Sequence, residues 1–276
     1  MQLKFEHQGK RYQCATQDAT SIAIELDFDG PQPNYFGVPP ASSSVLKLDG
    51  FVGDTQKGGS CNVNSLNFVP HCNGTHTESV GHIVDQDVPI GQIAIKPVLV
   101  AMLVTVQPKT GKQVTQSYRP EIEAADQIID STQLLEAVAK VGDPKLISPD
   151  ALIVRTLPND VDKHSRTYTL KNASPFFSVE AIEAVNALGV EHLLVDLPSI
   201  DRSNDKGLLT NHHIFWSVPE TTHDLTESTK RNKTITEMVF VADEIADGLF
   251  GISIQVPALK SDAAPSRPII MPLKPA

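Results

Sequence analysis

The residues best suited to chemistry gather in one short segment, from His71 to His82, with the sequence HCNGTHTESVGH. It holds three histidines, one cysteine and one glutamate. Imidazole, thiolate and carboxylate groups together suit zinc, and they admit manganese or iron where histidine and carboxylate dominate. The segment therefore predicts half of a metal site.

The spacing within this segment favours an extended or irregular conformation. In a strand, side chains alternate between two faces, so four residues with ligand chemistry would point the same way. These four are Cys72, His76, Glu78 and His82. A helix would place them as two pairs on opposing sides, and Gly74 would weaken it. We expect one face of an extended segment to carry the ligands.

The other half of the site should come from separate strands. Glu237 lies in the apolar run ITEMVF, where a buried carboxylate is costly unless a cation meets it. His212 and His213 form a pair that is either ligating or part of a surface loop. Asp196 and Asp201 follow an expected strand, and they either cap turns or bind metal.

Composition limits the partners of the chain. Its 276 residues include 23 Lys and Arg against 33 Asp and Glu, a formal net charge of −10. The longest basic run is Lys230-Arg231, so we expect no nucleic-acid partner. No uninterrupted apolar stretch resembles a signal peptide or a membrane span, and the three cysteines are typical of a reducing compartment. We expect a cytoplasmic protein without a membrane partner.

The order of the expected elements predicts the fold class. Short strand-like runs joined by loops rich in Pro, Gly and Ser fill the first seventy residues, including 21–28 and 45–52. Residues 91–106 predict one or two buried strands. A helix is expected over 131–141, capped by Ser131-Thr132 and closed by Gly142.

Further along, a strand at 151–156, a helix at 178–189 and a strand at 191–197 predict a βαβ unit with parallel pairing. No repeat or composition break divides the chain. We therefore expect one α/β domain over residues 1–276, with a mixed sheet and flanking helices.

The run from Cys72 to His82 resembles the HxGTHxDxPxH signature of the putative cyclase family, whose best-known members are bacterial kynurenine formamidases. The resemblance extends through ALIVRT, through SPFFSVEAIEAVNALGVEHLLVDLPSID, and to the ending TEMVFVADEIADGLFGISIQVPALKSDAAPSRPI, so it covers roughly residues 65–273. It implies a swivelling β/β/α fold, a centre of one or two divalent metal ions, most often zinc, and hydrolysis of an amide or related bond.

Carried over by position, the resemblance implies roles for individual residues. His76 and Glu78 would be ligands, with Glu78 bridging, and His212 or His213 with Glu237 would complete the shell of a second metal. His82 would be the acid/base residue. Three positions depart from the signature. Cys72 stands where the family has its first ligand histidine, Glu78 replaces aspartate, and Val80 replaces proline.

Cysteine is a competent zinc ligand, so either Cys72 or the neighbouring His71 fills the first ligand position. The implied activity is metal-dependent hydrolysis of an amide bond in a small molecule, like that of an arylformamidase. The alternatives are a related cyclase or lactone hydrolase and a metal-binding module without catalysis. The resemblance also implies a homo-oligomer.

Overall fold

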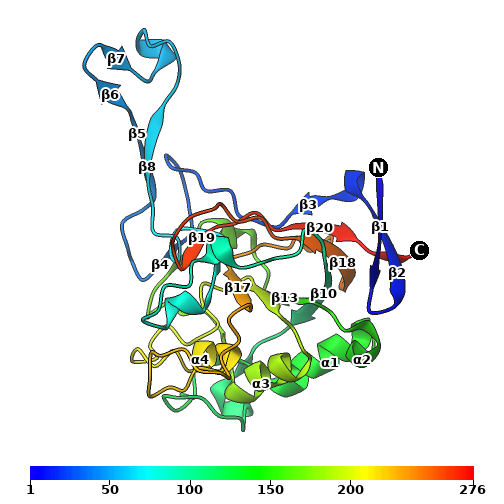
Figure 1. Ribbon diagram of the computed structural model, residues 1–276. Coiled ribbons are helices and arrows are strands. Elements are labelled where there is room, and N and C mark those ends of the chain that lie inside the picture. The colour runs from blue at the N-terminus through cyan, green and yellow to red at the C-terminus, as the bar shows by residue number, and fades with distance from the viewer.

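A nine-stranded mixed sheet runs through the centre of the protein, which we describe from a computed structural model of residues 1–276 (Figure 1). The strand order is β19-β9-β17-β16-β13-β10-β18-β20-β3. In chain order the strands are β3 (Thr20–Ser21), β9 (His76–Glu78), β10 (Leu99–Val106), β13 (Ala151–Thr156), β16 (His192–Val195), β17 (Thr234–Glu237), β18 (Gly248–Ser253), β19 (Ala263–Pro265) and β20 (Ile269–Pro272).

Parallel pairing is confined to the middle of the sheet, where β10, β13, β16 and β17 are neighbours. All other strands join it in the antiparallel direction. The βαβ unit predicted from the sequence is present, since β13 pairs with β16 and a helix lies between them in the chain. The α/β class and the mixed sheet with flanking helices are confirmed.

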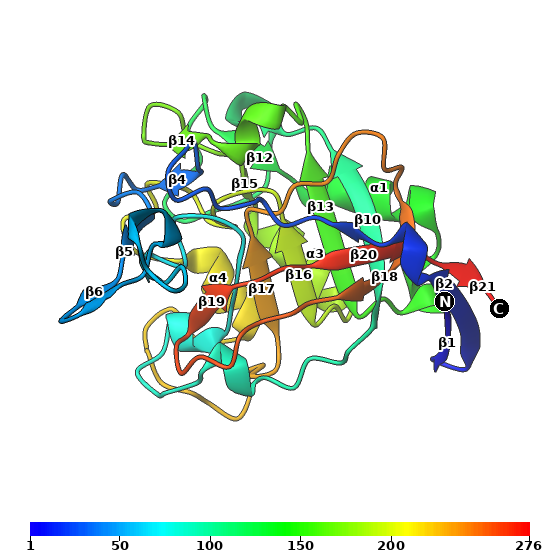
Figure 2. The same ribbon diagram turned by 90° about the horizontal axis from the view of Figure 1, so that it is seen from above.

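Four helices lie on one side of the sheet (Figures 1 and 2). They are α1 (Ser131–Val141), α2 (Pro144–Ile147), α3 (Val179–Ala187) and α4 (Thr210–Trp216). Ser178 caps α3 by accepting a hydrogen bond from the amide of Ala181. The N-cap of α1 is Asp130 instead of the expected Ser131-Thr132, because its carboxylate accepts from the amide of Gln133. None of the helices is both long and apolar enough to cross a bilayer.

The core has two parts because the central strands are buried on both faces. Along β10, Val100, Met102 and Val104 pack in the cluster under the helices, whereas Leu99 and Leu103 pack in a second cluster on the opposite face. This alternation follows the two-residue period of a strand. The uninterrupted apolar sequence of β10 is the signature of a strand covered on both sides.

The N-terminal strand expected over 21–28 forms only at its start. Ile22 and Ile24 are buried, but the amide of Ile24 donates to the hydroxyl of Thr75 and not to a neighbouring strand. A single bridge between Ala23 and Val239 is the only further pairing. The prediction of a continuous strand over 21–28 was therefore wrong, although Ile22 and Ile24 are buried.

Small sheets complete the architecture. They are β1 (Gln2–His7) with β2 (Lys10–Ala15) and β21 (Lys274–Pro275), β11 (Lys109–Thr110) with β12 (Gln127–Ile129) and β15 (Phe176–Phe177), β4 (Asn34–Tyr35) with β14 (Thr167–Tyr168), β5 (Ser42–Val45) with β8 (Asn64–Asn67), and β6 (Lys47–Leu48) with β7 (Phe51–Val52). The last two pairs form an arm, residues 42–67, that projects from the body of the protein (Figure 1).

Candidate metal centre

Strand β9 places two of the predicted ligands side by side. His76 and Glu78 are two positions apart, so both side chains leave the same face of the strand, and both residues are completely buried. Thr77 points the other way, where its hydroxyl bonds Thr236 and Ser266 at 2.8 Å each. These two hydrogen bonds of Thr77 hold β9 between β17 and β19, although all three residues of β9 are polar.

His76 is oriented as a metal ligand would be. Its Nδ1 donates to the carbonyl of Gly74 (2.9 Å), which leaves the lone pair of Nε2 facing the interior of the site. Glu237 lies opposite His76 in the sheet register, with Oε2 at 3.4 Å from that nitrogen. The other carboxylate oxygen of Glu237 accepts from the amide of Ile200 (3.1 Å). The carboxylate expected to need a cation is therefore buried beside a histidine.

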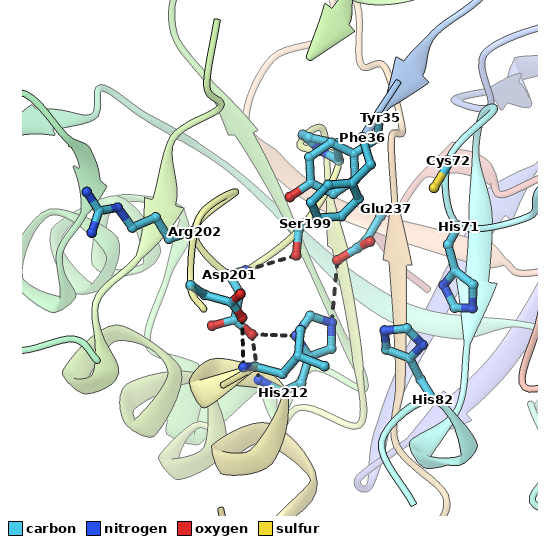
Figure 3. Close-up of a pocket in the computed structure, with 13 residues that line it drawn as sticks. Tyr35, Phe36, His71, Cys72, His82, Ser199, Asp201, Arg202, His212 and Glu237 are labelled. Carbon is cyan, nitrogen blue, oxygen red and sulfur yellow. Dashed lines mark hydrogen bonds and ion pairs between the residues drawn. The ribbon is translucent and has the colours of Figure 1, made fainter. Parts of the chain in front are cut away.

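Helix α4 brings His212 to the same place (Figure 3). Its Nδ1 donates to Asp201 (2.5 Å) and its Nε2 lies 3.1 Å from Oε1 of Glu78. Burial lowers the pKa of His212, but Glu78 and Asp201 outweigh burial and raise it well above the usual value. Asp201 is itself held by the hydroxyl of Tyr118 (2.7 Å). Asp201 thus orients His212. This role differs from both alternatives given for it, a turn cap and a direct metal ligand.

The remaining aspartate of that segment lies elsewhere. Asp196 forms a buried ion pair with Lys163 (2.8 Å) and accepts from the amide and hydroxyl of Thr156. It belongs to none of the groups that could hold a metal. His213 is also turned away, since its Nδ1 bonds the carbonyl of Val218 and its ring packs against His223.

His82 reaches the site from a 3₁₀ helix, Val80–His82, that follows β9. The turn folds the chain back, so Nε2 of His82 lies 3.9 Å from Oε2 of Glu78 although the extended segment has ended. Its Nδ1 faces Asp262 at 3.4 Å. About a quarter of the His82 side chain is exposed, and it lines the pocket that opens onto the site.

Asp262 is a site residue that the sequence reasoning missed. It immediately precedes β19, and its carboxylate contacts His71 (2.8 Å) as well as His82. Hydrogen bonds from these two imidazoles hold the pKa of Asp262 far below its usual range. No spacing signal exists for this contact, because it joins residues 191 positions apart in the chain.

His71 lies within the site and Cys72 lies at its wall. Nδ1 of His71 is 3.0 Å from Oε2 of Glu78. Burial lowers the pKa of His71, but Asp262 and Glu78 raise it to about 10. Cys72 instead packs with Tyr35 and Tyr168, and burial raises the pKa of its thiol to about 11. All three cysteines are free thiols.

The donor set fits a divalent ion. Nε2 of His76 is buried and has no hydrogen-bond partner, which is costly unless a cation meets it. Oε2 of Glu78 is also buried, and imidazole nitrogens of His71 and His82 approach it at 3.0 and 3.9 Å. Three groups of side chains have donor atoms within 4.8 Å of one another. They are His71, His76 and Glu78; Glu78, His82 and His212; and His71, His82 and Asp262. Glu78 belongs to two of these groups and could join two ions.

An aromatic wall borders the pocket above these residues (Figure 3). The pocket has about 430 Å³ of empty space, its open mouth included, and Tyr35 and Phe36 line it together with Leu209. The two aromatic rings are 3.9 Å apart, and the Phe36 side chain is 64% exposed. Arg202 also lines the pocket, but Glu123 and Asp126 neutralise its guanidinium at 2.8 and 3.1 Å. The pocket therefore offers an apolar surface beside a polar centre.

Comparison with solved structures identifies the fold. A "potential metal-dependent hydrolase with cyclase activity" has a TM-score of 0.60 at 14% identity, with 93% of this chain and 98% of the other covered. A "predicted metal-dependent hydrolase" from Bacillus stearothermophilus has a TM-score of 0.57 at 13% identity, with 92% and 97% covered. Isatin hydrolase A from Labrenzia aggregata, bound to benzyl benzoate, has a TM-score of 0.60 at 12% identity, with 92% and 93% covered.

No curated protein matches the sequence significantly. The family model described as "Putative cyclase" matches residues 14–202, more than half of the chain. This match includes β9 and the segment around Asp201. The chain belongs to the putative cyclase family.

Proposed function

We propose that this protein is a metal-dependent hydrolase that cleaves an amide bond in a small aromatic molecule, as an arylformamidase does. The observation that carries the proposal is the convergence of His76, Glu78, His212 and Glu237 on one buried point, where Nε2 of His76 has no hydrogen-bond partner. Burying two carboxylates beside an unpaired nitrogen has a high free-energy cost, which a bound cation offsets. The metal-dependent hydrolases of the same fold support the same class of reaction.

The metal in this proposal is zinc or manganese, one or two ions per chain. His76, Glu78, His212 and Glu237 would hold it, and His71 would fill the first ligand position. The contact of His71 with Glu78 favours it over Cys72, which packs among tyrosines and belongs to none of the groups that could hold a metal. When bound, the ion would polarise the substrate carbonyl and lower the pKa of the attacking water.

His82 is the acid/base residue of the proposed reaction. Asp262 accepts a hydrogen bond at Nδ1, so Nε2 is left to take a proton from water as the water oxygen bonds to the carbonyl carbon. The same nitrogen then delivers the proton to the leaving nitrogen as the carbon–nitrogen bond breaks. An N-formyl arylamine would yield formate and the free arylamine.

The aromatic wall supports an aryl substrate. Tyr35 and Phe36 line the pocket that His82 also lines, so an aryl group could pack against them while its amide reaches His82. The solved isatin hydrolases of this fold make isatin a second substrate to test.

The direct test is an assay of the metal-loaded protein on N-formylkynurenine and isatin, before and after treatment with a chelator. We expect hydrolysis of at least one substrate, its loss in the chelator, and its return with zinc or manganese. Metal-loaded protein that hydrolyses neither substrate nor any member of a wider amide and lactone panel would leave only the alternative of a non-catalytic metal-binding module.

A further inference from the structure

A second polar hollow lies at the beginning of strand β17, at the end opposite the candidate metal centre. Glu237 ends β17 at the metal centre, whereas Lys233 immediately precedes the same strand and lines the hollow. The hollow has an empty volume of about 1200 Å³, and none of its nine lining residues is hydrophobic. Gly189, which follows α3, and Ser217, which follows α4, form part of its rim.

Three cations without carboxylate partners dominate this hollow. Lys230, Arg231 and Lys233 fall within four positions, and none of them forms an ion pair, although acidic residues outnumber basic ones in the chain. Glu191 is the one carboxylate in the lining. The hollow thus carries an excess of positive charge in a protein whose net charge is −10.

Lys233 is fixed in place and is not a freely moving surface lysine. Its Nζ donates to the side-chain carbonyl of Asn186 (2.6 Å) and lies 4.5 Å from the centre of the Phe215 ring. Burial, and then the charge of Lys230, lower the pKa of Lys233 to about 8. A negative charge between the two lysines would relieve this repulsion.

We propose that the hollow formed by Lys230, Arg231 and Lys233 binds a small, multiply charged anion, such as phosphate or a phosphate monoester. Arginine and lysine donors around a polar cavity supply both the charge and the hydrogen bonds that phosphate oxygens require. An extended polyanion is disfavoured, because the chain as a whole has a formal net charge of −10. This site is independent of the proposed hydrolase activity.

A built-in reporter lies beside the hollow. Trp216, the only tryptophan of the chain, donates its indole N–H to the carbonyl of Lys233 (2.9 Å). The carbonyl of Trp216 accepts from the amide of Lys230 (2.8 Å). Its ring lies 5.6 Å from that of His212, so α4 connects the hollow to the candidate metal centre. Occupation of the hollow is therefore expected to change tryptophan emission.

The test is a titration of the full chain with inorganic phosphate at constant ionic strength, followed by calorimetry and by Trp216 emission. We expect one saturable transition with a dissociation constant in the millimolar range or below. In a Lys230→Ser/Arg231→Ser variant, which alters only exposed side chains, the affinity should fall at least tenfold. A Lys4→Ser/Lys274→Ser variant loses the same charge at exposed strand positions elsewhere and should bind as the wild type does.

Two results would overturn the proposal. One is the absence of saturable binding in the wild type. The other is an unchanged affinity in the Lys230→Ser/Arg231→Ser variant, which would place the phosphate elsewhere, including at the metal centre. Cosedimentation with phosphatidic acid vesicles identifies the source of the anion. Protein that pellets in a Lys230- and Arg231-dependent manner takes a lipid headgroup, and protein that stays in solution takes a soluble phosphate.

Discussion

At the scale of single residues, two histidines show how the protein prepares nitrogen donors for a cation. His76 gives its Nδ1 proton to a backbone carbonyl and His212 gives its own to Asp201, so both direct Nε2 toward Glu78 and Glu237. A carboxylate or carbonyl behind a ligating histidine fixes the tautomer and the ring orientation. These contacts separate ligand candidates from the histidines that merely pack.

His82 and Asp262 form the pair on which proton transfer should depend. We expect His82→Ala to retain metal and to lower kcat by about 10²- to 10⁴-fold. Asp262→Asn should lower kcat by roughly 10- to 100-fold with little change in KM, because the ring is less well oriented. Steady-state kinetics and metal analysis of the two variants provide the check. An Asp262→Asn enzyme with wild-type kcat would remove the carboxylate from the mechanism.

His71 and Cys72 are neighbours with opposite expected roles. His71→Ala should weaken metal affinity about tenfold or more, since it removes a nitrogen beside Glu78. Cys72→Ser preserves the size of a side chain that packs with Tyr35 and Tyr168 and should bind metal normally. Competition with a chromogenic zinc chelator measures both affinities. Loss of metal in the serine variant alone would assign the first ligand position to the thiolate.

At the scale of elements, prediction from sequence succeeded where the hydrophobic period is clear. The helix at 131–141 and the strand at 151–156 match α1 and β13. Helix α4 was missed because it is seven residues long and almost entirely buried, so it lacks the solvent-exposed polar face that gives a helix its hydrophobic period. Strand β9 has the opposite property, since its three residues are polar and yet buried.

Site residues could be predicted only where local sequence carried a signal. His76, Glu78 and His82 share one segment, and Glu237 stood out as a carboxylate in an apolar strand. Asp262 gave no signal, because only the pairing of β19 with β9 brings it to the site.

Strand β16 carries a histidine that should make stability depend on pH. His192 is 3% exposed, bonds Thr234, and burial lowers its pKa to about 4. Its neutral form is favoured in the folded state, so this contribution is complete above an unfolded pKa of about 6.5 and declines as pH falls toward 4, by at most about 1.4 kcal/mol per pH unit.

Urea unfolding of wild type and His192→Asn at pH 7 and pH 5 measures this contribution. The variant replaces the ring with an amide that does not titrate, so its free energy of unfolding should fall less between the two pH values. An equal fall in both proteins would contradict the assignment to His192.

At the scale of the whole molecule, the two proposed sites lie at opposite ends of strand β17. The candidate metal centre lies where β17 ends, and the cationic hollow lies where it begins. The projecting arm, residues 42–67, contributes to neither.

A homo-oligomer remains a prediction, and the arm is the surface that we expect it to bury. Leu48 and Leu66 on the arm are 63% and 54% exposed. Exposed apolar side chains on a projecting hairpin are typical of a protein interface. Sedimentation velocity should give a mass at least twice the 29.9 kDa of the chain. A Leu48→Ser/Leu66→Ser variant should then dissociate, whereas a monomeric wild type at micromolar concentration would exclude the prediction.

The measurement that tests the central claim most directly is the metal content of tag-free protein by plasma mass spectrometry, with Glu237→Ala as the matched variant. The buried carboxylates of Glu78 and Glu237 and the unpartnered Nε2 of His76 predict about one to two zinc or manganese ions per wild-type chain and a marked loss in the variant. Wild-type protein that stays free of metal after supplementation with both ions would contradict the account.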